Sequence, residues 1–434
     1  MLTRFGRNNR LPVRGKPTPV QEASDIAARK VAVDAYVQKY THVCKIPAAP
    51  VKHPQTTAHC VVLTGATGSL GSHLIAQLVA LPSVTTVVCL NRTSRESDHE
   101  TRQHKAFRNR RIHIDKRGLS KLRVLETDTS KSRLGLTSDE YFDLVHSITH
   151  IVHNAWPMSG NRPIHRFEAQ FQGMRNLINL CHEANAATSR IISFQFISSI
   201  AVVGHQPLWS GNSLVREERV SIESVLPNGY GYAKYVCERM LDATLAQHAQ
   251  HFRAMSVRLG QVAGNSKTGY WNTQEHLSFL VKSSQTLRAL PDFDNQLSWT
   301  PVDLVAATLS DLLFQTSGPP DPIYHIDNPV RQPWRSMIPI WAAALDIPQS
   351  NIVPFDEWVR RVRHFPGSVE KDNPAHKLVE FLDNNFLRMS CGGLLLDTTR
   401  ARAHSPTLAA VGPVSDKVAL GYIQYWKEID FLSA

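Results

Sequence analysis

Residues 60–71, Cys-Val-Val-Leu-Thr-Gly-Ala-Thr-Gly-Ser-Leu-Gly, decide the fold that this sequence predicts. Residues 60–64 form a short apolar strand, and the glycines after it lead into a helix-like run that ends at Leu81. In such a context one glycine permits the tight turn, one lets the backbone approach a pyrophosphate, and one lets helix and strand pack closely. We therefore expect a dinucleotide here, with its phosphates held by backbone N–H groups and by the positive end of the helix. The residues expected to contact it in this loop are Gly65, Thr67, Gly68, Ser69, Leu70 and Gly71.

Strands alternate with helices on both sides of this loop. The short β-rich runs are residues 60–64, 84–90, 122–126, 148–153 and 191–198. This alternation predicts an α/β fold, a Rossmann-type doubly wound parallel sheet with helices on both faces. Beyond about residue 265 the alternation weakens, and four segments look helical, at residues 275–290, 302–315, 334–346 and 376–387. We interpret them as a smaller, mostly helical C-terminal lobe that binds the substrate.

The end of the second strand bears on the choice of dinucleotide. That strand ends in Leu90-Asn91-Arg92. An enzyme that uses NAD usually has Asp or Glu at this place to bind the ribose hydroxyls, whereas Arg suits the additional 2′-phosphate of NADP. We therefore predict NADPH as the cofactor, bound by Asn91 and Arg92. Arg95 and Arg102 are possible helpers, and solvated surface arginines are an equally credible interpretation of these two.

Two further segments are expected beside the cofactor. Asp128 follows the third strand, where an acid commonly meets the adenine amino group, and a helix cap is an equally good interpretation of it. Residues 153–157, His-Asn-Ala-Trp-Pro, follow another apolar strand. We expect them to form a loop near the cofactor that contacts it through Asn154 and Ala155.

Proton chemistry is predicted at residues 229–235, Gly-Tyr-Gly-Tyr-Ala-Lys-Tyr. Tyr230 and Lys234 are four apart, so a helix places both on one face, one turn from each other. A neighbouring ammonium favours the phenolate, and we expect Lys234 to lower the pKa of Tyr230 and to hold the nicotinamide ribose. Tyr232 cannot take that part, because residues two apart do not face each other on a helix.

A third polar group should polarise the carbonyl that is reduced. The apolar strand 191–198 ends in Ser198-Ser199, at the carboxyl end of a buried strand, where ligands bind in such sheets. We choose Ser199 as the third catalytic residue beside Tyr230 and Lys234, with Ser198 as a supporting residue.

The chain thus divides into three predicted parts. Residues 1–58 form a basic arm, a short helix and a linker, residues 59–265 an NADP-binding Rossmann domain, and residues 266–434 a mostly helical substrate-binding lobe. The short helix covers residues 24–40, with one apolar face that carries Ile26, Val33, Val37 and Tyr40. The Pro-containing stretch 47–58 is the linker.

Composition narrows the class of protein. The net charge is +11, and residues 92–123 hold eleven Lys and Arg against four Asp and Glu, which a cofactor phosphate, an acidic protein partner or a solvated loop could explain. No nucleic-acid-binding motif is present, and no run of about 18 apolar residues predicts a membrane span. The six cysteines are scattered and the histidines lack metal-ligand spacing. We expect free thiols, no metal and a cytoplasmic location.

With these motifs the chain resembles a known family, the extended short-chain dehydrogenases. Within them it looks like the thioester reductase domains that end fungal non-ribosomal-peptide-synthetase-like and polyketide enzymes, which are related to the male-sterility fatty acyl reductases. The glycine loop, Ser198-Ser199 and residues 229–235 carry the general likeness. The more specific matches are His-Asn-Ala-Trp-Pro (153–157), Val-Arg-Leu-Gly-Gln-Val-Ala-Gly (257–264), Tyr-Trp-Asn (270–272), Trp-Thr-Pro-Val-Asp (299–303) and Asn-Pro-Val-Arg-Gln-Pro-Trp (328–334).

The resemblance implies a reaction. An acyl group arrives as a thioester on the phosphopantetheine arm of a carrier protein or on coenzyme A, and NADPH reduces it to an aldehyde, in some relatives further to an alcohol, within fungal secondary metabolism. Ser199 and Tyr230 would stabilise the developing oxyanion, Tyr230 would donate the proton, and Lys234 would tune Tyr230. Two departures from the family pattern occur: Ala233 before the lysine is tolerable because it lies off the face of Tyr230 and Lys234, whereas Met158-Ser159-Gly160-Asn161 after the tryptophan motif bears on acyl specificity. Because no adenylation region or carrier domain is found, the resemblance implies a stand-alone reductase, which either meets its carrier in trans or acts on a free carbonyl compound or a coenzyme A ester.

Three other functions use the same scaffold. A ketone or aldehyde reductase that acts on a free pathway intermediate shares all residues of the reduction, and only the lobe with Trp271, Trp299 and Trp334 can distinguish it. A non-catalytic NADP-sensing regulator is disfavoured by the intact Tyr230 and Lys234. A sugar-nucleotide epimerase is disfavoured by Arg92.

Overall fold

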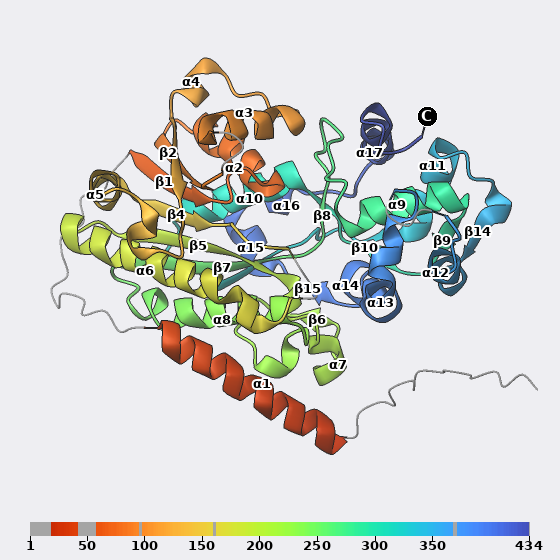
Figure 1. The fold of residues 1–434 in the computed structure, drawn as a ribbon, viewed down its shortest axis with the longest axis horizontal. Helices are drawn as coiled ribbons and strands as arrows, with labels where there is room; N and C mark the ends of the chain where they lie inside the picture. Colours follow the sequence, from red (N-terminus) through yellow and green to blue (C-terminus); the bar gives the residue numbers. More distant parts are fainter. Residues whose placement is uncertain (1–18, 42–57, 95–97, 159–161, 368–370, 434) are drawn as a thin grey trace, which may run out of the picture.

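The centre of the molecule is a seven-stranded parallel sheet with the strand order β12-β7-β5-β4-β1-β2-β3 (Figure 1). The computed structural model describes residues 19–41, 58–94, 98–158, 162–367 and 371–433, so the predicted basic arm and all of the predicted linker except Ala58 lie outside the described residues. The strands are β1 (His59–Thr64), β2 (Val84–Arg92), β3 (Leu122–Thr127), β4 (His150–His153), β5 (Ile192–Ser199), β7 (Phe252–Leu259) and β12 (Ile323–Ile326). The predicted α/β class, the Rossmann-type sheet and its first five strands are confirmed.

Both faces of this sheet are covered by helices because the strands are apolar on both sides. In β1, Val61 and Leu63 join a core with α2 (Ser69–Ala80) and α10 (Val302–Phe314). Val62, which points the other way, joins the core on the opposite face. The helices of that second face are α5 (Ser138–Ser147), α6 (Glu168–Thr188) and α8 (Gly229–Asp242).

The strand order reverses between β1 and β4. The chain proceeds from β1 outward to β2 and β3, then returns to the other side of β1 for β4 and β5. Thr64 and His153, the last residues of β1 and β4, are register partners, and His153 in turn pairs with Phe196 of β5. Ligands bind at such reversal points, beyond the carboxyl ends of the strands.

The helix α1 (Pro19–Tyr40) lies along the outer side of α8 and contacts it (Figure 1). Val33, Val37 and Tyr40 are buried against the sheet domain and Ile26 packs beside them, which confirms the predicted apolar face. Arg239 of α8 donates to Asp34 at 2.7 Å.

The C-terminal lobe has a separate core that is rich in tryptophan. Its fully buried tryptophans are Trp271, Trp299, Trp334, Trp341, Trp358 and Trp426. Its main helices are α9 (His276–Leu287), α11 (Trp334–Ala344), α12 (Phe355–Arg363) and α17 (Asp416–Glu428). The sheet also draws β12 and the covering helix α10 from beyond residue 265, so the sheet domain is not one continuous segment. The division into domains at that residue stays a prediction.

Three of the four helical segments predicted in this region are confirmed as α9, α10 and α11. The fourth, residues 376–387, is instead a chain of short pieces that includes a π-helical turn at Leu382–Phe386 between α13 (Val379–Phe381) and α14 (Leu387–Ser390). Asp383, Asn384 and Asn385 stand in succession there, and such side chains compete with the helix for backbone hydrogen bonds.

The remaining elements are short. The helices are α3 (His99–Asn109), α4 (Lys116–Leu119), α7 (Gln206–Ser210), α15 (Thr399–His404) and α16 (Pro406–Ala409). Four strand pairs, β6 with β15, β8 with β11, β9 with β14 and β10 with β13, use β6 (Leu214–Val215), β8 (Val262–Ala263), β9 (Leu290–Asp292), β10 (Gln296–Leu297), β11 (Thr300–Pro301), β13 (Gln332–Pro333), β14 (Ile352–Pro354) and β15 (Leu395–Leu396). Within the described ranges, no helix combines the length and the apolar character needed to cross a bilayer.

Candidate active site

The glycine loop after β1 has the tight geometry that its sequence predicts. Gly65 has a φ of +72°, and a Cβ there would lie 2.9 Å from the backbone of Ala155. A Cβ on Gly71 would lie 2.1 Å from the carbonyl oxygen of Gly65. Neither position has room for a side chain, so strand, helix and the loop after β4 pack directly on one another.

The start of α2 is suited to an anion. Its N-cap residue is Gly68, and no side chain among the described residues caps the helix there. The N–H groups of the first turn therefore keep their hydrogen-bonding capacity for a ligand, at the positive end of a 12-residue helix. Thr67, Ser69 and Leu70 are all partly exposed beside it. These features fit the diphosphate of a dinucleotide.

The loop after β4 is joined to the glycine loop by hydrogen bonds. The Thr64 hydroxyl oxygen accepts from the backbone N–H groups of Asn154 at 3.0 Å and Ala155 at 2.9 Å. The Asn154 side-chain amide donates to the Gly65 carbonyl at 3.3 Å. The structure thus brings Asn154 and Ala155 to the reversal point of the sheet. Thr64, which sequence reasoning did not assign to the site, is the residue that connects them.

The residues predicted to bind the cofactor at the end of β2 differ in their exposure to solvent. Asn91 is buried and its amide donates to Gln103 at 3.1 Å, and the Gln103 amide donates to the Ala66 carbonyl at 3.3 Å. Arg92 is exposed, and the guanidinium of Arg102 donates to its backbone carbonyl. Arg95 lies outside the described residues. The buried Gln103 thus links β2 to the glycine loop. The sequence did not predict this contact, because a single polar residue in a helical segment does not reveal which residues it will contact.

The side chain of Asp128 binds a residue of its own loop. Its carboxylate accepts from the Ser130 backbone N–H at 3.1 Å and from the Ser130 hydroxyl at 2.6 Å. This geometry is that of a cap on a turn, and a contact with adenine stays a prediction.

Tyr230 and Ser199 meet at the carboxyl end of β5. Asn228 caps α8 by accepting the Gly231 N–H at 2.7 Å, and Tyr230 follows in the first turn. Burial raises the pKa of Tyr230, and the hydrogen bond between its hydroxyl and that of Ser199 opposes this effect. The prediction that Lys234 lowers the Tyr230 pKa below its usual value is therefore wrong, because burial of the phenol outweighs the stabilisation of its charged form.

Lys234 is buried one turn further along α8. Its side chain is 3% exposed, and Nζ donates to the Ile197 carbonyl at 2.6 Å. The same Nζ lies 4.0 Å from the ring centroid of Trp156 and 4.8 Å from that of Phe196. Desolvation lowers the pKa of Lys234 to about 7. Sequence reasoning placed Trp156 near the cofactor but did not find its contact with the lysine.

The two serines at the end of β5 have different partners. Whereas Ser199 meets Tyr230, the Ser198 hydroxyl donates to Glu238 at 2.5 Å. Glu238 also accepts from Arg258 of β7 through Nε at 3.0 Å and through a terminal nitrogen at 2.7 Å. Arg258 is fully buried. Ser198 thus belongs to a buried ion pair that ties β5, β7 and α8 together.

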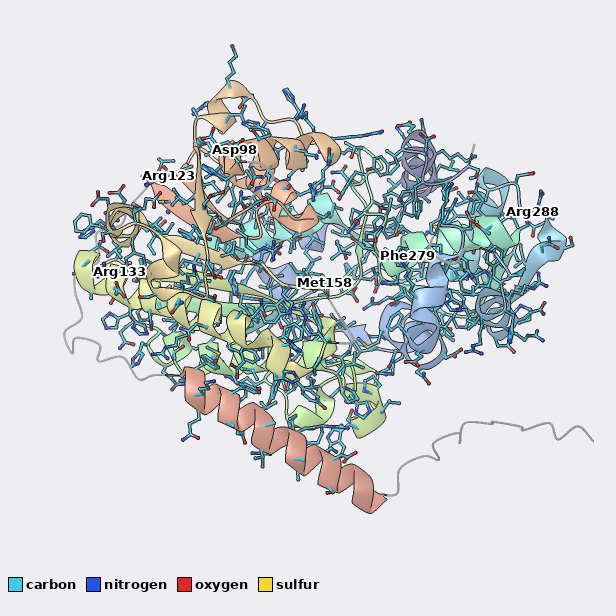
Figure 2. All side chains as sticks on the ribbon, in the orientation of Figure 1. Asp98, Arg123, Arg133, Met158, Phe279 and Arg288 are labelled. Atoms are coloured by element: carbon cyan, nitrogen blue, oxygen red, sulfur yellow. The ribbon has the colours of Figure 1, made fainter. Side chains whose placement is uncertain are left out.

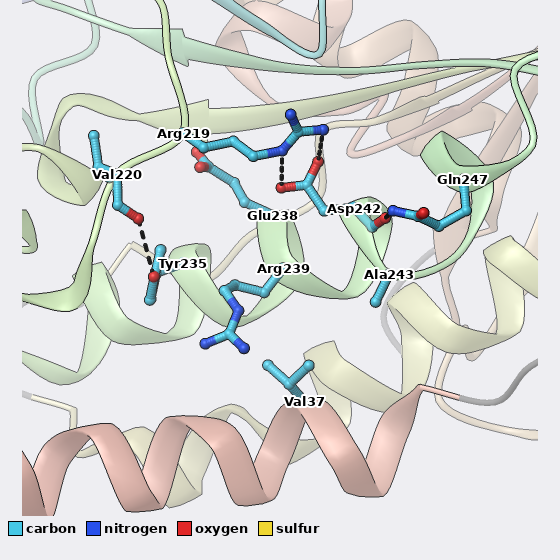
Figure 3. Close-up of a pocket in the computed structure, with 9 residues that line it drawn as sticks. All are labelled: Val37, Arg219, Val220, Tyr235, Glu238, Arg239, Asp242, Ala243 and Gln247. Carbon is cyan, nitrogen blue, oxygen red and sulfur yellow. Dashed lines mark hydrogen bonds and ion pairs between the residues drawn. The ribbon is translucent and has the colours of Figure 1, made fainter.

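Other hollows and clusters lie away from this site. Figure 3 shows a pocket between α1 and α8, lined by Val37, by Tyr235 and by the ion pair of Arg219 with Asp242, among others. Its lining includes Glu238, whereas Ser199, Tyr230 and Lys234 are not among the residues that line it. In Figure 2 Met158, which is 82% exposed, lies in the middle of the view between the sheet domain and the lobe. No cluster of three or more possible metal ligands occurs in the described parts of the chain.

Comparison with known proteins places this geometry in a family. Residues 63–309 match the family model described as Male sterility protein, an NAD-binding model. The chain is 59% identical over 439 residues to the non-reducing polyketide synthase tazA of Aspergillus terreus, covering 98% of this chain and 17% of that protein. It is 51% identical over 421 residues to the citrinin polyketide synthase of Monascus ruber, covering 95% of this chain and 16% of that protein. The chain therefore spans about a sixth of the length of these relatives.

Solved structures agree on the fold. The terminal R domain from the myxalamid PKS-NRPS pathway has a TM-score of 0.73 at 22% identity and covers 93% of this chain and 99% of its own. The reductase domain of PhqB from Penicillium fellutanum has a TM-score of 0.64 at 18% identity and covers 92% and 99%. The family match covers more than half of the chain. The chain therefore belongs to the Male sterility protein family of NAD-binding domains, and it has the fold of terminal reductase domains.

Proposed function

We propose that this domain uses NADPH to reduce an acyl thioester to an aldehyde and so releases the product of a fungal biosynthetic enzyme. The observation that carries the proposal is the group Ser199, Tyr230 and Lys234 at the carboxyl end of β5, beside a glycine loop shaped for a dinucleotide. The relatives named as polyketide synthases support an acyl substrate of this kind.

The chain's own residues would serve the reduction as follows. NADPH, when bound, supplies a hydride to the thioester carbonyl carbon. The hydroxyls of Ser199 and Tyr230 would hydrogen-bond the carbonyl oxygen as it becomes negative. Because burial raises the pKa of Tyr230, its phenol is protonated at neutral pH and can donate that proton to the oxygen. Breaking of the C–S bond in the resulting hemithioacetal then gives the aldehyde and the free thiol.

The preference for NADPH rests on the end of β2. Arg92 is exposed there, and the buried Asn91 occupies the position where an NAD enzyme usually carries an acid. Arg102, whose guanidinium reaches the Arg92 carbonyl, adds a second positive charge at the same edge. Although Glu126 of β3 lies 3.8 Å from Arg102, β2 itself ends without an acid, and its exposed Arg92 favours a 2′-phosphate.

The thioester would be presented by the phosphopantetheine arm of a carrier. The relatives are about six times longer than this chain, so a carrier in the same polypeptide and a carrier in trans both fit the proposal. The five cysteines within the described residues are free, which suits a reducing compartment such as the cytoplasm.

The test follows NADPH absorbance with acyl-pantetheine, acyl-coenzyme A and carrier-loaded thioesters, beside the matching free aldehydes and ketones and with NADH for comparison. We expect oxidation with thioesters, and a loss of about a hundredfold or more in Tyr230→Phe. Turnover with free carbonyls alone would contradict thioester reduction and make the domain a ketone or aldehyde reductase. Binding of NADPH without turnover of any substrate would point to a sensor, and product analysis separates aldehyde from alcohol.

A further inference from the structure

The indole ring of Trp156 faces the ammonium of Lys234. Nζ lies 4.0 Å from the ring centroid, well inside the distance at which a cation is attracted by an aromatic face. Phe196 offers a second ring at 4.8 Å. Among the described residues, no carboxylate forms an ion pair with Lys234, and its one hydrogen bond goes to the Ile197 carbonyl. The ammonium therefore depends on ring faces and a carbonyl instead of a counter-charge.

The position of the indole ring is fixed from two sides. Trp156 stacks on Phe167 with centroids 5.9 Å apart and an interplanar angle of 21°. It meets Phe196 edge-on at 5.9 Å, and His153 lies 6.4 Å away. The rings thus form a fixed aromatic wall against which the lysine is held.

The charged and titratable neighbours of Lys234 favour its charged form less than burial opposes it. His153, from β4, is neutral because burial lowers its pKa to about 3. Cys237, one turn away on α8, is a buried thiol whose pKa is raised, so it is neutral as well. Glu238 attracts the ammonium from a distance, but its carboxylate is occupied by Arg258 and Ser198.

We propose that Trp156 is a positioning residue that holds Lys234 against the end of β5 and extends to higher pH the range in which its side chain is a charged ammonium. The inference rests on the proposed function, whose reduction uses the group Ser199, Tyr230 and Lys234, and a charged Lys234 would add positive charge near the oxygen that becomes negative. Burial favours the neutral form of this lysine, and the aromatic face offsets part of that cost without bringing in a carboxylate. A carboxylate would raise the pKa of the lysine further, and it would also compete for the nicotinamide ribose that Lys234 is expected to hold.

The pH dependence of turnover tests this role. Activity that needs charged Lys234 is lost as the pH rises through the pKa of the lysine, which is about 7 in the unaltered protein. Removing the aromatic face in Trp156→Leu should move this alkaline limb to lower pH by about 0.5 to 1.5 units, from the usual strength of such contacts. Trp156→Phe, which keeps a weaker face, should shift it less. Trp209→Leu is the control, because Trp209 is 57% exposed on α7, away from the lysine.

Two outcomes would overturn the proposal. A limb that moves to higher pH would mean that the ring acts by excluding water, since water entering the site stabilises the ammonium. An unchanged limb with lower turnover would mean that Trp156 only supports the loop. The ionisation can also be read without substrate or cofactor, by NMR of protein labelled with 15N at the lysine Nζ, with Lys234→Met to assign the signal. If the unaltered domain fails to turn over thioesters, the proposed function fails while this titration still decides the role of Trp156.

Discussion

Two buried cations lie close together in this domain, and their surroundings differ. Arg258 of β7 is fully buried, and two of its nitrogens bind the carboxylate of Glu238 at 2.7 and 3.0 Å. Lys234 of α8 is 3% exposed and has only a carbonyl and two aromatic rings. A buried cation with a carboxylate keeps its charge and acts as a structural tie, whereas one without it becomes titratable near neutral pH. The paired site thus holds the strands together and the unpaired site can take part in chemistry.

The largest effect should follow from breaking the paired site. Arg258→Met leaves the Glu238 carboxylate buried with Ser198 as its one remaining side-chain partner, and we expect a loss of about 3–5 kcal/mol in the free energy of unfolding. Urea denaturation followed by tryptophan fluorescence measures it. The double variant Arg258→Met with Glu238→Leu should recover part of the loss, because no unpaired charge then remains. Equal stability of Arg258→Met and the unaltered protein would contradict the structural role.

The unpaired site should give the opposite result. Lys234→Met replaces a buried ammonium by an apolar side chain of similar length, so the free energy of unfolding should stay equal or rise. Turnover should fall about a hundredfold, because Tyr230 and the bound cofactor lose the neighbouring positive charge of Lys234. Denaturation and NADPH oxidation are measured on the same preparation. A variant that loses stability and activity together would place Lys234 with the structural cations.

The pH dependence of stability sharpens the comparison. The pKa of Lys234 is about 7 in the folded protein and about 10.4 in an unfolded chain. Between these values the unfolded state binds more protons, so stability rises with pH by up to about 1.4 kcal/mol per unit from this group. The rise should be present in the unaltered protein from pH 7 to 9 and absent in Lys234→Met. The difference between the two proteins removes the contribution of other groups, and parallel curves would contradict the lowered pKa.

The smallest effects should separate the two serines. Ser198→Ala removes one hydrogen bond from Glu238 and should cost about 1 kcal/mol of stability with little change in turnover. Ser199→Ala removes the hydroxyl that meets Tyr230 and accepts the Ala201 N–H at 3.2 Å, so it should lower turnover about tenfold and cost about 1 kcal/mol of stability. Denaturation midpoints and NADPH oxidation, taken on both variants, check the pair. A loss of turnover in Ser198→Ala, with turnover unchanged in Ser199→Ala, would contradict these roles.

The features that could be predicted from the sequence are those that depend on residues close together in the chain. The apolar run before Gly65 and the crowding at Gly71 are local, so strand, loop and helix could be predicted from their own residues. The spacing of Tyr230 and Lys234 likewise depends on one helix only. The ring of Trp156 reaches Lys234 across 78 positions of sequence, and the Ser198–Glu238–Arg258 contacts join three elements. No periodicity encodes such contacts, and burial, which reverses the expected shift of the Tyr230 pKa, is a property of the assembled core.

The seventh strand has a consequence for how the chain acquires its fold during synthesis. β12 pairs with β7, and between them the ribosome must make more than sixty residues, many of which belong to the lobe. Ala401, Leu408 and Val411, from still later in the chain, complete the core over α10. Until they emerge, β7 presents an open edge and the sheet an uncovered apolar face, both of which invite association with other chains. Expression of residues 59–265 alone should therefore give an aggregating product, and a chaperone that shields β7 would act in the interval before β12 arrives.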